Sequence, residues 1–306
     1  MNDCARIVEK ANRLGTVIPS FNVPYLPMVE PVVRAVAAVG SFAFVATARL
    51  EWHKFEAGGP EAVFEEYAKW KHPAHTRLHL DHVPVIDEDG ERVDYAGIIG
   101  LAVKLGYDSV MVDGSRLSLD DNISSTKEAV EIAHAAGVPC EAELGAVMGH
   151  EAGPLPPYEE LFASGRGFTD PDETVRFVRE TGCDWLSVAV GNIHGAVSGA
   201  ARDKKKVEAR LNISHLRRLG EAADIPLVLH GGSGVRKEHV LDAIRGPIAK
   251  INVGTEIRQP YEQVLAETHS VEKAQEAVFE RTSWVITDWL GITGNARELC
   301  AGEGAS

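Results

Sequence analysis

The chain has 306 residues, of which 44% are hydrophobic and 25% are charged, with 45 acidic against 31 basic side chains and a net charge of −14. This length can bury a large core as one barrel-sized domain or as two smaller ones. The acidic balance repels polyanions and excludes nucleic acid as a partner, although a small phosphorylated metabolite remains allowed. No apolar run approaches membrane-spanning length, the N-terminal MNDCARIVEKANRLG is untypical of a targeting peptide, and the four cysteines are widely spaced. We therefore expect a cytoplasmic protein with reduced thiols and no membrane contact.

Strand-like apolar runs alternate with helix-like segments along the chain. The predicted strands span 17–23, 41–47, 77–83, 109–115, 139–145, 185–191, 226–232 and 249–255. Helical periodicity falls at 26–39, 95–105, 120–136, 172–181, 213–223 and 237–244. Eight β–α units predict a single (β/α)8 barrel domain over 1–306, with a C-terminal helical extension at 271–306. A doubly wound open sheet is the alternative, but no G-x-G-x-x-G follows the first strand.

Two segments interrupt this alternation. The first, 84–94 (PVIDEDGERVD), is acidic and typical of a loop. The second, 150–167, is rich in proline and glycine and long enough to cover an active site. We therefore expect a mobile active-site loop over 146–168.

Polar side chains follow the predicted strands, at the end where barrel enzymes hold their active sites. They are Asn22, Asp81, His82, Asp113, Ser115, Glu143, Asn192, His194, His230, Asn252 and Thr255, together with the glycine run 231–234. A lone histidine at a strand end usually makes an ordinary hydrogen bond. Three histidines from separate strands can instead converge on one divalent cation and leave a position open for substrate, as in catalytic zinc sites. The glycines of LVLHGGSG let backbone N–H groups approach an anion such as a phosphate.

The motifs SFNV, LHLDH, SVMVDGS, EAELG, GNIHG, LVLHGGSG and AKINVGTE follow one another in this order. In this, most of the chain resembles the class II, metal-dependent ketose-bisphosphate aldolases, such as the fructose- and tagatose-bisphosphate aldolases. The resemblance implies a (β/α)8 barrel, zinc or another divalent cation, and often a monovalent cation such as Na⁺ or K⁺. It also implies reversible cleavage of a ketose phosphate into dihydroxyacetone phosphate and an aldehyde through a zinc-stabilised enediolate. Members of the family are dimers or larger, so we expect a homodimer or homotetramer.

The resemblance also implies roles for individual residues. The zinc ligands fall on His82, His194 and His230, with Glu143 near the metal and Asp113 and Asp121 at a second cation. Asp81 falls on the acid that handles the proton of the aldehyde oxygen, and Glu151 on the base that takes the carbon proton. Asn252 would bind the enediolate oxygens, and Lys250 needs no catalytic role because no Schiff base is required. The implied substrate and phosphate contacts are Asn22, Gly195, Gly231, Gly232, Ser233, Asn252, Gly254 and Thr255.

The chain departs from the family pattern where it would hold the aldehyde half of the substrate. Ala48 and Arg49 stand where small polar residues are expected, Val83 replaces a glycine, and 84–94 has the character of an insertion. We therefore expect unchanged donor chemistry with a different acceptor, and Arg49 is a candidate for recognising an anionic one. Two other functions stay open at this stage. One is a metal-dependent epimerase or other carbon-acid enzyme acting on a sugar phosphate or sugar acid, and the other is a non-catalytic partner subunit.

Overall fold

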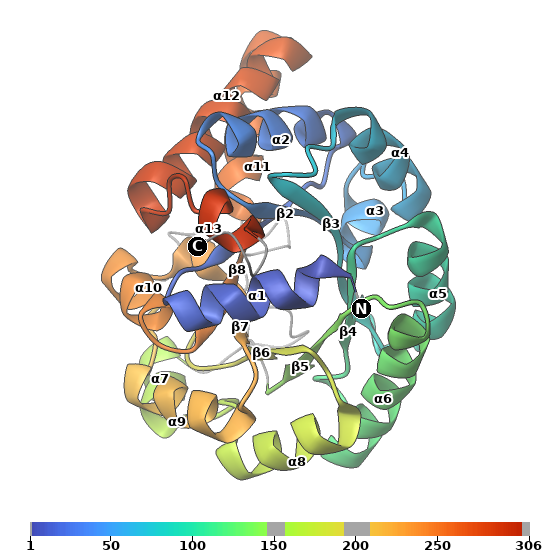
Figure 1. Ribbon diagram of the computed structural model, residues 1–306, viewed down its shortest axis with the longest axis vertical. Helices are drawn as coiled ribbons and strands as arrows, with labels where there is room; N and C mark the ends of the chain where they lie inside the picture. The colour runs from blue at the N-terminus through green and yellow to red at the C-terminus, as the bar shows by residue number, and fades with distance from the viewer. Residues whose placement is uncertain (1, 146–156, 193–208, 302–306) are drawn as a thin grey trace.

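The computed structural model describes residues 2–145, 157–192 and 209–301 (Figure 1). Within these ranges, parallel strands form one closed barrel in chain order, in which β8 pairs back onto β1. The strands are β1 (Ile18–Asn22), β2 (Ala43–Ala48), β3 (Thr76–Pro84), β4 (Ser109–Asp113), β5 (Cys140–Leu144), β6 (Trp185–Val188), β7 (Leu227–Leu229) and β8 (Ile248–Val253). The predicted (β/α)8 fold is confirmed. The strand predicted at 226–232 is shorter than expected, because β7 ends at Leu229, three residues before the predicted end.

Helices surround the barrel in Figure 1. They are α2 (Val29–Ala38), α4 (Pro60–Trp70), α5 (Tyr95–Leu105), α6 (Leu119–Ala135), α8 (Pro171–Thr181), α9 (Ile213–Ala223), α10 (Lys237–Ile244) and α11 (Thr255–Thr268). The helices predicted at 95–105, 213–223 and 237–244 are confirmed to the residue. Polar side chains mark two of these starts, since Asp94 and Asn212 accept hydrogen bonds from backbone N–H groups of α5 and α9. The helix predicted at 26–39 is divided into a 3₁₀ turn, η1 (Leu26–Met28), and α2.

Short helices also occur outside the predicted helical segments. One is α3 (Arg49–Lys54), directly after β2, and another is α7 (Tyr158–Ser164), which lies inside the segment expected to be a mobile loop. Glutamates in the first turn of α7 and Gly165 at its end are typical helix boundaries. Residues 158–164 of the expected active-site loop are therefore helical, and residues 146–156 lie outside the described part of the chain.

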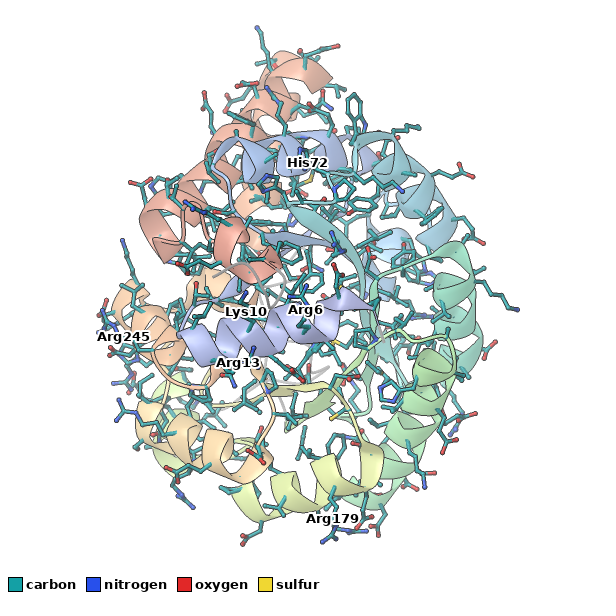
Figure 2. The ribbon with its side chains drawn as sticks, viewed as in Figure 1. Arg6, Lys10, Arg13, His72, Arg179 and Arg245 are labelled. Carbon is teal, nitrogen blue, oxygen red and sulfur yellow. The ribbon has the colours of Figure 1, made fainter. Side chains whose placement is uncertain are left out.

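Helix α1 (Asp3–Leu14) closes one end of the barrel. Its buried face, which includes Ile7 and Val8, packs in one cluster with Ile18, Phe44 and Trp185 of the strands. Because Ile18 and Trp185 begin their strands, α1 covers the amino-terminal end of the barrel and crosses the opening in Figure 1. Figure 2 labels Arg6 and Lys10 along this helix, and both donate hydrogen bonds to the carbonyl of Ala301. The carboxyl ends of the strands are left on the opposite side.

The C-terminal part of the chain is helical. It consists of α12 (Val271–Trp284), the π-helix η4 (Val285–Leu290) and α13 (Ala296–Cys300). Helix α12 packs against α2 and α11, so it extends the ring of helices outward at the top of Figure 1. Among the described helices, none combines the length and the apolar character needed to cross a membrane.

Candidate metal centre and active site

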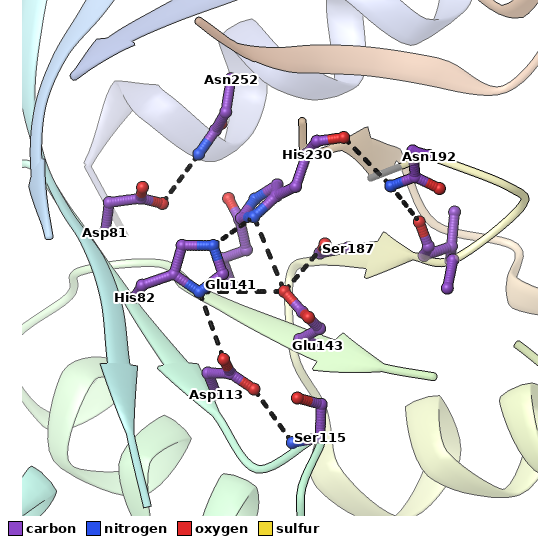
Figure 3. A network of polar contacts seen from close by, with 12 residues as sticks. Asp81, His82, Asp113, Ser115, Glu141, Glu143, Ser187, Asn192, His230 and Asn252 are labelled. Atoms are coloured by element: carbon purple, nitrogen blue, oxygen red, sulfur yellow. Dashed lines mark hydrogen bonds and ion pairs between the residues drawn. The ribbon is translucent and has the colours of Figure 1, made fainter. Parts of the chain in front are cut away.

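Two histidines face each other at the carboxyl end of the barrel (Figure 3). Nε2 of His82, on β3, lies 2.6 Å from Nδ1 of His230, directly after β7. His82 has a φ of +33°, a backbone conformation that non-glycine residues rarely adopt, and the β3–β4 register shifts beside it. Such strain is concentrated at functional sites. Two ring nitrogens this close share a hydrogen, and both point into the space between the two rings.

Carboxylates surround this histidine pair. Nδ1 of His82 lies 3.2 Å from Oδ2 of Asp113 and 3.9 Å from Oε2 of Glu143, and the same Glu143 oxygen lies 3.6 Å from Nδ1 of His230. Burial lowers the pKa of His82, but Asp81, Asp113 and Glu143 outweigh it and raise this pKa to about 10. Burial and the neighbouring Asp113 raise the pKa of Glu143 well above its ordinary value. The pocket therefore favours a positive charge between its rings and carboxylates.

These donors fit a divalent cation. Asp81, His82 and His230 form one group whose ligand atoms lie within 4.8 Å of one another, and His82, Asp113 and Glu143 form another. Imidazole nitrogens with carboxylate oxygens suit zinc and several other divalent metals, so the donor set does not fix which metal is bound. The predicted third histidine ligand, His194, lies outside the described residues.

Asp121 does not join these groups. Its exposed carboxylate accepts a hydrogen bond from the Ser118 hydroxyl at the start of α6. This is the ordinary use of polar side chains at a helix start, since Ser118 also accepts from the Asp121 backbone N–H. Of the two aspartates predicted at a second cation, the structure places Asp113 beside the histidines and Asp121 on the surface.

Asp81 lies beside the histidines and is held by two amides. Asn22 at the end of β1 donates to its Oδ2 at 2.8 Å, and Asn252 of β8 donates to its Oδ1 at 2.9 Å. Burial raises the pKa of Asp81, but the nearby His82, His79, His230 and Lys250 bring it well below its ordinary value. Asp81 is therefore an oriented, ionised carboxylate, able to accept a proton at the edge of the pocket.

A buried polar layer lies beneath the site and was missed in the sequence. Lys250 Nζ lies 2.8 Å from Oε2 of Glu141, whose Oε1 lies 2.8 Å from Nε2 of His230. Burial raises the pKa of Glu141, but Lys250 and the histidines outweigh it and bring this pKa to about 2. His79 completes the layer, with its Nδ1 2.8 Å from the Ser109 hydroxyl. The alternation in EAELG and KIN was the available signal, because residues two apart in a strand share one face.

Glycine loops follow β7 and β8 next to the histidines. Gly231 has a φ of +68° and leads into the 3₁₀ turn η3 (Gly232–Gly234), which packs against β8. A Cβ on Gly232 would lie 2.7 Å from Cδ1 of Ile251, so the close approach of these loops requires glycine there. Gly254 precedes α11, which begins at Thr255, so a helix amino terminus also faces this end of the barrel. The Ser233 side chain and Gly195 lie outside the described structure.

A sequence profile described as "Fructose-bisphosphate aldolase class-II" matches residues 2–295. The chain belongs to the class II fructose-bisphosphate aldolase family. Of the predicted site residues, the barrel of this family member brings together Asn22, Asp81, His82, Asp113, Glu143, His230 and Asn252.

Curated relatives and solved structures support this membership. The chain is 44% identical over 154 residues to the uncharacterized protein YdjI of Escherichia coli, covering 50% of each chain. It is 35% identical over 204 residues to a fructose-bisphosphate aldolase of Streptococcus pyogenes, covering 66% of this chain and 60% of that protein. These matches thus span 50–60% of the curated relatives' own lengths.

Structural matches cover nearly the whole barrel. The crystal structure of the E. coli YdjI aldolase has a TM-score of 0.74 and 29% identity, and the match covers 95% of this chain and 98% of that one. A putative fructose-1,6-bisphosphate aldolase of Coccidioides immitis has a TM-score of 0.76 and 26% identity, with 97% and 99% covered.

The segment that departs from the family pattern lies beside Asp81. Helix α3 follows β2 and contacts β3, and the acidic segment 84–94 pairs with it through an ion pair between Arg49 and Asp87 at 3.3 Å. Arg116 also donates to the Asp87 carbonyl at 3.0 Å. Burial and the charge of Asp81 raise the pKa of Glu51 to about 8, against the hydrogen bond it accepts from the Ala48 N–H. This edge of the aldolase barrel therefore carries two arginines, Arg49 and Arg116, and the Glu51 carboxyl, which holds a proton at neutral pH.

Proposed function

We propose that this protein is a metal-dependent class II aldolase, a lyase that reversibly cleaves a ketose phosphate or bisphosphate into dihydroxyacetone phosphate and an aldehyde. The observation that carries this proposal is the facing pair of His82 and His230, enclosed by carboxylates and lying beside the glycine loops of β7 and β8. Family membership supports the same reaction class, as do the relatives that are named fructose-bisphosphate aldolase.

In this proposal His82 and His230, with the predicted His194, hold a divalent cation, for which zinc is the family's usual choice. A bound cation would polarise the donor carbonyl as a Lewis acid and offset the negative charge that develops when the adjacent carbon loses its proton. Glu143 and Asp113 orient His82 from its Nδ1 side and provide negative charge around the ligands.

Proton transfer is divided between two carboxylates. Asp81 accepts the hydroxyl proton during cleavage and returns it to the aldehyde oxygen during condensation. Its two amide partners orient it, and the neighbouring histidines and Lys250 keep it ionised. Glu151 is the proposed base for the carbon proton, on a segment outside the described residues. Asn252 donates to Asp81 and would also reach the substrate oxygens.

The phosphate of the donor would bind the backbone N–H groups of the β7 and β8 loops. Gly231, Gly232 and Gly254 let the backbone approach, and Thr255 begins the helix whose amino terminus favours an anion. A monovalent cation such as Na⁺ or K⁺ would bind near the same phosphate. Asn22, held against Asp81, would contact the substrate from the β1 side.

The acceptor half would lie against α3. Arg49 has its guanidinium held by Asp87, and this contact fixes it at the edge next to Asp81. We therefore assign Arg49 to recognition of an anionic group on the aldehyde. A homodimer or homotetramer and a cytoplasmic location remain predictions from the sequence.

The test is aldol condensation of dihydroxyacetone phosphate with a panel of neutral and anionic aldehydes, using zinc-loaded protein. We expect a phosphorylated ketose product that disappears with a chelator and with the His230→Ala variant. His134→Ala is the matched control, because His134 pairs with Asp184 at the other end of the barrel. Conversion of a ketose phosphate to its stereoisomer without release of aldehyde would instead favour an epimerase. Wild-type condensation by His230→Ala would contradict the metal site.

A further inference from the structure

A fully buried ion pair crosses the interior of the barrel beneath the metal centre. Lys250 of β8 and Glu141 of β5 each have 0% of their surface exposed, and Nζ lies 2.8 Å from Oε2. β5 and β8 are not neighbours in the barrel, so the two side chains meet across its interior. Removing two charges from water is costly, and apolar residues of similar volume would often be as stable or more so. Stability alone therefore does not account for the pair.

On one side the pair determines which nitrogen of His230 carries hydrogen. Glu141 Oε2 accepts from Lys250 and from the Trp185 indole N–H at 2.5 Å, and Oε1 lies 2.8 Å from Nε2 of His230. A carboxylate paired with an ammonium group can only accept, so Nε2 of His230 must be the donor. In the neutral ring this leaves a lone pair on Nδ1, the nitrogen that faces His82 and the proposed cation.

On the other side the pair determines the direction of an amide. Lys250 Nζ donates to Oδ1 of Asn252 at 2.7 Å, and the Nδ2 of the same amide lies 2.9 Å from Asp81 Oδ1. An ammonium group has donors and no acceptor, so the amide oxygen must face Lys250 and the amide nitrogen must face Asp81. Lys250 thereby makes Asn252 a donor toward the catalytic carboxylate.

We propose that Lys250 and Glu141 are positioning residues, which act as one unit on the two halves of the active site. The pair holds His230 in the tautomer that presents Nδ1 to a metal, and it holds Asn252 in the orientation that presents N–H to Asp81. Neighbouring His79 does not replace either contact, since its Nε2 lies 3.6 Å from Asp81 and 3.7 Å from Glu141 and makes no hydrogen bond. This inference rests on the proposed function, which assigns a divalent cation, usually zinc, to His82 and His230.

The decisive variant is the double substitution Lys250→Met with Glu141→Gln. Either single change leaves a buried charge without its partner, which destabilises the fold whatever the role of the pair. The double change removes both charges of the pair together, and glutamine can donate or accept toward His230, so folding is retained while the orientation is no longer fixed. Thr126→Val is the matched control, because Thr126 is a fully buried polar residue that bonds Asn122 away from this pair.

Two measurements on the folded variants, made without substrate, test whether the Lys250–Glu141 pair positions His230. The first is the tautomer of His230 in metal-free protein, from long-range proton–nitrogen NMR of histidine-labelled samples, with the signal assigned by its loss in His230→Ala. The second is zinc affinity, by competition with a chelating dye. We expect the wild type and Thr126→Val to show hydrogen on Nε2, and the double variant to show mixed tautomers and about 10- to 100-fold weaker zinc binding.

A double variant that keeps a single Nε2–H tautomer and wild-type zinc affinity would overturn the proposal and reduce the pair to core packing. Hydrogen on Nδ1 of His230 in the wild type would overturn it as well. Failure of the proposed function is distinguishable from both outcomes. A protein that binds zinc with the expected tautomer but catalyses no aldol reaction would retain the positioning role and lose only the reaction assigned to the site.

Discussion

The proton on Glu51 gives a prediction about stability that does not depend on the metal. Glu51 lies in the first turn of α3, which packs against β2 and β3. β2 carries no charged side chain, whereas β3 presents Asp81 and His82 to this carboxyl. Burial first, and then the Asp81 charge, raise the pKa of Glu51 from 4.5 to about 8. The folded protein therefore retains a proton that the unfolded chain has already released at neutral pH.

The extra proton on folded Glu51 determines the sign and the size of the change in unfolding free energy with pH. Between the unfolded pKa of 4.5 and the folded pKa of about 8, the folded state binds one more proton, so stability falls as pH rises. The slope is about 1.4 kcal/mol per pH unit. Glu51→Gln cannot titrate and lacks this loss. The free energy of unfolding of the variant relative to wild type should therefore rise by about 2 kcal/mol between pH values of about 5.5 and 7.

The assay is urea unfolding of metal-free wild type and Glu51→Gln across that pH interval, followed by circular dichroism. Glu65→Gln is the matched control, because Glu65 is an exposed glutamate on the neighbouring helix α4. Its difference from wild type should stay nearly flat over the interval. A difference for Glu51→Gln that is equally flat would refute the claim that this carboxyl keeps its proton at neutral pH.

Further predictions concern the reaction. Asp81→Asn should slow cleavage and condensation about 10²- to 10⁴-fold and slow carbon-proton exchange much less, whereas equal losses would contradict its assignment to the aldehyde oxygen. Glu151→Gln should slow that exchange by a similar factor with zinc affinity unchanged, and normal exchange would move the base elsewhere. Gly232→Ala places a Cβ 2.7 Å from Ile251, so KM for the phosphorylated donor should rise several-fold without loss of zinc. An unchanged KM would separate this loop from phosphate binding. Arg49→Ala should raise KM for anionic aldehydes and not for neutral ones, and a uniform change would remove its role in recognition.

The barrel and the outer face of the site were predictable from the sequence. Apolar runs at regular spacing reveal the strands, and the polar residue that ends each run must lie at the same end of a parallel barrel. His82, His230 and Asp81 are strand-end residues of this kind, and the structure brings them together. The expectation for Asp121 came from the resemblance alone, and the structure places this residue on the surface at the start of α6.

The inner layer was not predictable in the same way. A lysine in a strand is usually exposed, and one sequence does not show that Lys250 is buried or that its partner is Glu141. The pair joins β5 to β8 across the barrel, so the alternation within each strand shows which residues share a face but does not show that these two side chains meet. The pairing of Arg49 with Asp87 is similar, because it depends on how the acidic segment 84–94 folds back onto α3.

In the proposed function, this site makes the hydroxymethyl carbon of dihydroxyacetone phosphate acidic with the help of a bound cation. Proton NMR of dihydroxyacetone phosphate in heavy water with zinc-loaded protein tests this directly, because it needs no knowledge of the acceptor aldehyde. We expect stereospecific loss of one hydroxymethyl hydrogen signal, which stops when a chelator removes the metal and resumes when zinc is restored. Absence of exchange in protein that holds its zinc would contradict the claim, and the family's reaction could then no longer be assigned to this site.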